Sequence, residues 1–155
     1  MKITEKDRLI LRELQKDSSQ PLKELSKKTG IAVSTLHSRI GQLKKEGVIK
    51  KFSVVVDPAK LGKGATAMVF LKMRQSVGHD ANTHLVIADK LRKLPEINDI
   101  FIIAGEFDIC LKVKGTSIDD IANLVMSRLR GIGEVTDSQT FVVFTNAKES
   151  LDVDI

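Results

Sequence analysis

The stretch SKKTGIAVSTLHSRIGQLKKEG, residues 26–47, constrains the fold more than any other part of the chain. Leu36, Ile40 and Leu43 lie at i, i+4 and i+7, the spacing of a single apolar stripe along an α-helix. Gly30 interrupts the pattern ahead of that helix, because glycine readily adopts the left-handed conformation that ends the preceding helix. The sequence therefore predicts two helices joined by a tight turn.

A further helix precedes this pair. Thr4 and Asp7 form a capping pair at its start, because the threonine hydroxyl can accept a backbone N–H of the first turn. Pro21 suits the first position of the second helix, where its missing N–H would be unpaired in any case. The three predicted helices run from about Glu5 to Lys16, over 21–29, and from about Val33 to Glu46. Together they form a helix-turn-helix arrangement with a third helix to pack on.

The pattern changes after residue 46. The β-branched run GVIKKFSVVVD, 47–57, predicts a strand, and PAKLGKG, 58–64, a turn or linker. The remainder predicts strands over 64–73, 97–103, 108–114 and 134–144, and helices over 80–94 and 117–130. This order, βαββαβ, is the split βαβ or ferredoxin-like fold, one antiparallel sheet with two helices on one face. The fold class is therefore α+β, with a helix-turn-helix domain over 1–60 and a ferredoxin-like domain over 61–155.

The apolar positions also predict which way the two later helices face. The expected inward positions are Ala81, Leu85, Ala88 and Leu91 in the first and Ile118, Ile121, Val125 and Leu129 in the second. The sheet face away from these helices also carries apolar residues, so it needs a cover. Pairing with a second copy of the chain would supply one.

Charge is unevenly divided between the two predicted domains. Residues 1–60 carry 14 Lys and Arg against 7 Asp and Glu, a balance of +7, while residues 61–155 carry 11 against 13, a balance of −2. The two balances sum to the net charge of +5. The first domain is thus suited to a polyanion, and the second is not.

The third helix carries small polar residues and one arginine on the side away from its apolar stripe. An α-helix fits the DNA major groove, where Ser and Thr can bond to several bases and Arg can pair with guanine. Lysines near both ends of the unit suit phosphates, which position a protein without reading sequence. The candidate DNA-binding residues are Ser34, Thr35, His37, Ser38, Arg39, Gln42, Lys27, Lys28, Lys45 and Lys50. The expected partner is double-stranded DNA.

Several motifs together resemble the Lrp/AsnC (leucine-responsive/asparagine regulator, feast/famine) family. They are the D-x-x-IL-x-x-L-Q pattern in DRLILRELQ, ELSKKTGI, SRIGQLKKEGVI, DPAKLG, the hairpin AGEFDICLKVKG and the final RGIGEVTDSQTFVVF. The resemblance implies a transcription regulator that forms dimers and, above them, tetramers or octamers. It also implies that a small amino acid binds at dimer–dimer contacts of the second domain, with no other cofactor.

The family's effector positions fall on the hairpin turn and on the start of the last strand. By that resemblance the candidate effector residues are Gly105, Glu106, Phe107, Asp108, Thr136, Ser138 and Thr140. An ammonium group would pair with a carboxylate such as Asp108, and a glycine turn exposes N–H groups to a ligand carboxylate. From the residues alone, AGEFD is an ordinary tight hairpin turn. The family's tyrosine at this turn is replaced by Phe107, so leucine is not assumed to be the effector.

Other functional classes find little support. No apolar run reaches the roughly 18 residues of a membrane helix, and the charged start MKITEKDRLI does not resemble a signal peptide, so we expect a cytoplasmic protein with no membrane partner. The single cysteine, Cys110, excludes an intramolecular disulfide and a multi-cysteine zinc site, and no metal site is predicted. No catalytic constellation is present, so an enzyme is not expected. Two alternatives stay open: an architectural protein that coats DNA, and an amino-acid-sensing regulatory subunit of an enzyme.

Overall fold

The computed structural model describes residues 2–74 and 81–155, and the chain forms two compact units. The first unit comprises Met1–Val56 together with Glu149–Ile155, and the second comprises Asp57–Lys148. The domains expected from the sequence, 1–60 and 61–155, differ from these units chiefly at the end of the chain, because residues 149–155 belong to the first unit.

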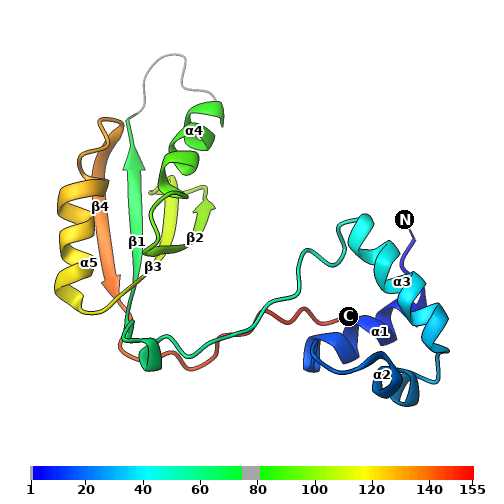
Figure 1. Ribbon diagram of the computed structural model, residues 1–155. Coiled ribbons are helices and arrows are strands. Elements are labelled where there is room, and N and C mark those ends of the chain that lie inside the picture. Colours follow the sequence, from blue (N-terminus) through cyan, green and yellow to red (C-terminus); the bar gives the residue numbers. More distant parts are fainter. Residues whose placement is uncertain (1, 75–80) are drawn as a thin grey trace. The chain divides into compact units, whose positions relative to one another are not determined.

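The first unit contains three helices, as predicted: α1 (Glu5–Lys16), α2 (Leu22–Thr29) and α3 (Val33–Lys45) (Figure 1). The capping pair at the start of α1 is confirmed, since the Thr4 hydroxyl accepts the Asp7 N–H at 3.3 Å and the Asp7 carboxylate accepts the Thr4 N–H at 2.8 Å. Pro21 occupies the N-cap of α2 rather than its first turn.

The turn between α2 and α3 is fixed by hydrogen bonds as well as by glycine. Gly30 has φ +68° and closes α2 in the left-handed conformation, as predicted. The Ser26 hydroxyl donates to the carbonyl of Ile31 at 2.7 Å, and the Thr29 hydroxyl donates to that of Leu25 at 2.7 Å. The bond from Ser26, together with the bond from the Ile31 N–H to the Thr29 hydroxyl at 3.3 Å, ties residue 31 to α2 just before α3 begins. The buried core beneath the turn contains Ile10, Leu25, Ile31 and Leu36.

The strand predicted over 47–57 is wrong. Residues 50–57 adopt no helix or strand, and Val54 and Val55 are each 83% exposed. A strand is stabilised by pairing with another strand, and the β-branched composition of this segment does not create a partner within the chain. The segment instead connects the two units.

The second unit has the predicted βαββαβ order. Its strands are β1 (Ala65–Met73), β2 (Ile97–Ile102), β3 (Ile109–Gly115) and β4 (Val135–Val142), paired antiparallel in the order β2-β3-β1-β4. A 3-10 turn, η1 (Ala59–Leu61), precedes the sheet, and the helices are α4 (Ala81–Leu91) and α5 (Ile118–Leu124), the latter continuing as a π-helical turn, η2 (Val125–Leu129).

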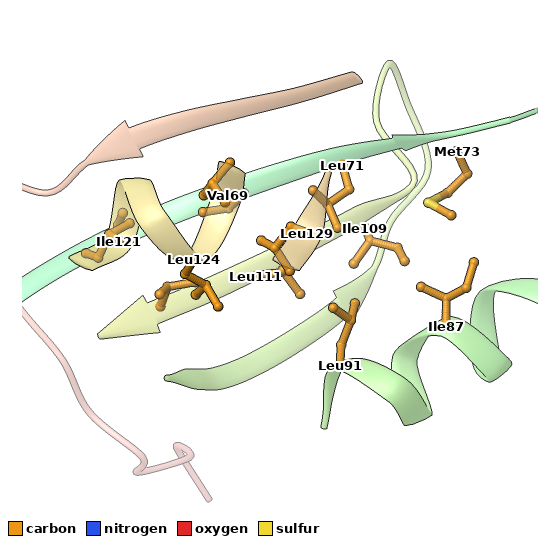
Figure 2. Close-up of a cluster of buried hydrophobic side chains, with 13 residues drawn as sticks. Val69, Leu71, Met73, Ile87, Leu91, Ile109, Leu111, Ile121, Leu124 and Leu129 are labelled. Carbon is orange, nitrogen blue, oxygen red and sulfur yellow. The ribbon is translucent and has the colours of Figure 1, made fainter. Parts of the chain in front are cut away.

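The core of the second unit lies between the two helices and one face of the sheet. Figure 2 shows side chains of both helices directed toward alternate residues of β1 and β3. Two positions depart from the predicted inward stripes: Leu85 is 50% exposed while Ile87 is buried, and Ile118 is 56% exposed. The helices therefore turn slightly from the expected orientation, because the core selects whichever neighbouring side chain fills it best. The side chain of Ala81 lies outside the described residues.

The opposite face of the sheet carries the aromatic side chains of the strands, Phe70, Phe101 and Phe141. The ring of Phe70 lies 5.7 Å from that of Phe107 and 5.5 Å from that of Phe141. Phe101 and Phe141 are 50% and 54% exposed. Cys110 pairs in register between Phe70 and Phe101, and burial raises the pKa of its thiol. This face is the apolar surface for which the sequence predicts a cover.

Candidate DNA interface and effector site

The side of α3 that faces away from the core is polar and accessible. Leu36 and Leu43 are fully buried, and this fixes which side of the helix faces outward. The helix begins at Val33 directly after Ala32, which caps it without a side-chain bond. The predicted base-reading residues that are exposed on this helix are Ser34, Thr35, His37, Ser38 and Gln42.

One predicted DNA-binding residue has a protein partner. The guanidinium of Arg39 donates from Nε to Asp7 Oδ1 at 2.9 Å and from Nη2 to Asp7 Oδ2 at 2.5 Å. Asp7 is fully buried, and 26% of the Arg39 side chain is exposed. A two-pronged contact of this kind is among the stronger hydrogen-bonded ion pairs in proteins. It joins the first turn of α1 to the middle of α3.

The same arginine also orients a neighbour on the exposed face. Its Nη1 donates to Gln42 Oε1 at 2.7 Å, which directs the glutamine amide along α3. The bonds to Asp7 and Gln42 use three of the five guanidinium N–H groups, so at most two are left for a base. The assignment of Arg39 as a DNA-reading residue therefore stays a prediction, while its contact with Asp7 gives it a definite structural role.

Asp7 is the residue of this site that the sequence prediction missed. The sequence pattern predicts only a capping role for Asp7. However, Asp7, Ile10 and Leu14 are spaced at i, i+3 and i+7, so all three share the inward face of α1. An acid on an apolar face signals a buried cationic partner, since an unpaired buried charge is costly. The environment lowers the pKa of Asp7 to about 2, chiefly through the hydrogen bond from Arg39. The pKa of Arg39 is correspondingly raised.

The four predicted phosphate-contacting lysines are all exposed. Lys27 lies 2.8 Å from Glu24, and Lys28 donates to Gln20 at 2.9 Å, both at the surface. Exposed pairs of this kind contribute little to stability, so a phosphate can displace them at small cost. Lys45 and Lys50 flank the end of α3.

The two groups of predicted effector residues meet at the end of β1. From one side, Asp108 accepts the Met73 N–H at 2.7 Å through Oδ2, and its own N–H donates to the Leu71 carbonyl at 3.0 Å. From the other side, the Thr136 hydroxyl donates to the Lys72 carbonyl at 3.2 Å. The hairpin turn and the start of β4 therefore flank the same three residues of β1.

The remaining effector candidates lie in the hairpin turn and along β4. Gly105 and Glu106 are exposed in the turn, where Gly105 has φ +144°. Ser138 accepts a hydrogen bond from Arg130 Nε at 3.1 Å, which adds an exposed cation that the sequence prediction did not include. Phe107 packs on Phe70 at the open sheet face. The residues further from the strand end are Phe107 and Thr140, the latter in register with Val69.

A separate polar pocket of about 290 Å³ opens at the other end of the sheet. Its lining includes Lys63, Glu96, Gly115 and Arg128, and none of the predicted effector residues. Among the described residues, no group of three or more His, Cys, Asp or Glu is arranged to hold a metal ion. Within the same part of the chain, no helix is long and apolar enough to cross a membrane.

A three-helix unit with an outward polar helix, followed by a ferredoxin-like sheet, is the architecture of a DNA-binding regulator with a sensory domain. The profile of winged helix-turn-helix DNA-binding domains matches residues 3–50, and that of the Lrp/AsnC ligand binding domain matches residues 66–153. An uncharacterised helix-turn-helix transcriptional regulator of Pyrococcus furiosus is 35% identical over 145 residues, covering 94% of this chain and 95% of the relative. The chain belongs to the Lrp/AsnC family of transcriptional regulators.

Solved structures have the same fold. AsnC of Escherichia coli superposes with a TM-score of 0.84 at 25% identity, covering 96% of this chain and 97% of AsnC. The transcriptional regulator NMB0573 of Neisseria meningitidis, solved as a complex with L-methionine, gives a TM-score of 0.90 at 23% identity, covering 99% and 97%. The family and fold predicted from the sequence are therefore confirmed.

The contact between Asp7 and Arg39 predicts a specific acid sensitivity. The pKa of Asp7 is lowered from 3.8 to about 2 in the folded protein. The ion pair therefore contributes its full stabilisation of the fold above about pH 3.8, and this stabilisation is lost as the pH falls toward 2. The loss amounts to about 2 kcal/mol between these two pH values. Urea unfolding of wild type and Asp7→Asn should show a stability difference that shrinks over this interval. A difference that is independent of pH would contradict the assignment.

Proposed function

We propose that this chain regulates transcription by sequence-specific binding to duplex DNA through α3. The observation that supports this most directly is the fixed orientation of that helix. Buried leucines and the Asp7–Arg39 contact hold one side, while Ser34, Ser38 and Gln42, spaced four residues apart, share the exposed side. Hydroxyl and amide groups at this spacing can reach successive base edges from one helix face.

The exposed lysines supply a component of the binding that does not depend on DNA sequence. Each neutralised phosphate releases counterions, so we expect affinity to fall steeply as salt is added. Lys27 and Lys28 lie at the end of α2, and Lys45 and Lys50 lie at the end of α3. In this proposal they fix the register of α3 along the duplex.

We further propose that two copies of the chain pair through the open face of the sheet. Phe70, Phe101 and Phe141 form an apolar surface there, and partly exposed aromatic side chains are enriched at protein interfaces. Two-fold pairing would present two α3 helices to sites separated by about 34 Å or a multiple of it, so the DNA target would be nearly palindromic. Sedimentation equilibrium that found only monomers would contradict this step.

The effector in this proposal is a small amino acid bound beside the end of β1, where dimers meet in a tetramer or octamer. Asp108 would attract the ammonium group, and the exposed N–H groups of the turn would face the carboxylate. The methionine complex of the Neisseria protein makes methionine the first ligand to test. The proposal assigns no catalytic role to the chain and places it in the cytoplasm.

The DNA assignment predicts different responses from two classes of variant. Ser38→Ala should weaken binding to a sequence selected from random DNA by about 1 kcal/mol, for a single hydroxyl contact, and Gln42→Ala by about 1–3 kcal/mol, for a two-bond contact. Both should barely change binding to unselected DNA. Lys45→Ala should weaken binding to selected and unselected DNA alike. It should also reduce the slope of log affinity against log salt concentration by about one. Fluorescence anisotropy over a salt series measures both quantities.

Two outcomes of that experiment would overturn the assignment. If selection yields no preferred sequence, the architectural alternative accounts for the DNA affinity. If Ser38→Ala and Gln42→Ala weaken selected and random DNA equally, α3 does not read the bases.

The effector assignment predicts that calorimetry with a panel of amino acids detects a ligand. Asp108→Asn should weaken it by about tenfold or more, because a hydrogen bond to a charged group is replaced by a neutral one. Asparagine keeps an acceptor for the Met73 N–H, so the hairpin should survive. Asp99→Asn, at an exposed position of β2, is the matched control. Equal affinity in both variants, or no binding by any amino acid, would remove the assignment.

A further inference from the structure

Residues 149–155 form part of the first unit, although they follow the last strand of the second. They lie against α1, where Figure 1 marks the C-terminus. Gln15 Nε2 donates to the Val153 carbonyl at 2.9 Å, and the Val153 N–H donates to Gln15 Oε1 at 2.7 Å. Arg12 Nε also donates to the main-chain oxygen of Ile155. We call Arg12 and Gln15 the α1 clip.

The geometry of the α1 clip matches an extended peptide. A side-chain amide offers one donor and one acceptor, as a backbone peptide does, so Gln15 pairs with both polar groups of Val153. Residues 153 and 155 are two apart, and alternate residues of an extended segment face the same way. Arg12 and Gln15 are three apart and share one face of the helix. The clip therefore contacts two successive positions on one side of the segment.

The side chains of the segment contribute less to the contact than its backbone. Leu151 is 77% exposed and Val153 is 65% exposed, so apolar burial is small. Net charge favours the contact only slightly, because residues 149–155 carry three acidic side chains while α1 carries four Lys and Arg against three Asp and Glu. A contact made of a few exposed hydrogen bonds is weak and reversible.

This weak contact matters because the chain runs from the first unit to the second and back again. The chain passes from the first unit to the second after Val56 and returns after Lys148. The first passage is an extended, exposed segment without regular structure. When the segment is docked, the first unit is connected to the second at two points rather than one. A second connection reduces the number of orientations open to the DNA-binding helices.

We propose that the α1 clip is a docking surface for residues 149–155 of the chain itself, and that the docked segment is a releasable second tether of the DNA-binding unit. Docking lowers the entropy lost when α3 engages DNA, because part of the orientational freedom is already removed. Release of the segment frees the unit and weakens DNA binding. The consequence for DNA rests on the proposed function, whereas the docking itself does not.

The test compares the double variant Arg12→Ala/Gln15→Ala with Arg8→Ala in the full chain. Arg8 is on the same helix and pairs with the exposed Glu5 (Nε to Oε1, 3.5 Å), so Arg8→Ala matches the loss of charge and keeps the bonds from Arg12 and Gln15 to the segment. Hydrogen-exchange mass spectrometry of the peptide that contains Val153 reports docking directly. We expect faster exchange in the double variant and wild-type exchange in Arg8→Ala. Equal exchange in wild type and the double variant would overturn the docking surface.

DNA affinity for the selected sequence then tests the tether. The double variant should bind about three- to tenfold more weakly than Arg8→Ala, a range set by the net worth of one or two hydrogen bonds. If exchange rises but affinity equals that of Arg8→Ala, the segment docks without acting as a tether and the proposal is overturned. If the wild type binds no DNA while exchange responds as expected, the proposed function fails and the docking surface stands.

Discussion

The ion pair between Asp7 and Arg39 is the interaction on which the DNA-binding unit depends. A fully buried carboxylate caps α1 and at the same time holds a guanidinium from the middle of α3. The contact thereby fixes the rotation of α3 about its axis in addition to its position. Leucine packing alone leaves such rotation less well defined, because apolar contacts are not directional. The contact therefore adds a directional constraint to the leucine packing that sets the exposed side of α3.

The two roles proposed for the second unit, pairing of copies and effector binding, use two different regions of the sheet. One sheet face is filled by α4, α5 and η2, and the other carries the aromatic surface. The strand end near Met73 lies away from the aromatic centre and gathers the hairpin and the start of β4. Pairing of copies and binding of an effector can therefore use different surfaces of one small sheet. A ligand changes the population of assemblies only if it binds one of them better than the others.

Local sequence patterns are sufficient to predict most of the helices and strands. The bounds of α1, α2 and α3 follow from apolar spacing and from signals such as Thr4 and Gly30, which act within a few residues of themselves. The βαββαβ order follows in the same way from alternating periodicity. The exposed candidates on α3 were likewise identified correctly as outward-facing.

The errors and omissions involve contacts between residues distant in sequence. The run ending in Val54 and Val55 has strand composition, but a strand needs a partner that composition does not provide. The partner of Arg39 is 32 residues away, and the α1 clip contacts residues 138 or more positions away. Ile87 replaces Leu85 because core packing selects between adjacent apolar side chains. Long-range contacts of this kind are decided by the assembled fold.

The most direct test of the account is the binding of selected DNA by the double variant Asp7→Leu/Arg39→Met. Arg39→Met alone leaves a buried unpaired carboxylate, which typically costs about 3–5 kcal/mol. Replacing both partners by apolar groups is often neutral, apart from about 1 kcal/mol for the capping bonds from Thr4 that Asp7→Leu also removes. If Arg39 acts by holding α3, the double variant should recover most of the affinity and stability that the single variant loses. A double variant that regains stability but binds selected DNA no better than Arg39→Met would show that the arginine reads the DNA itself, and would contradict the account.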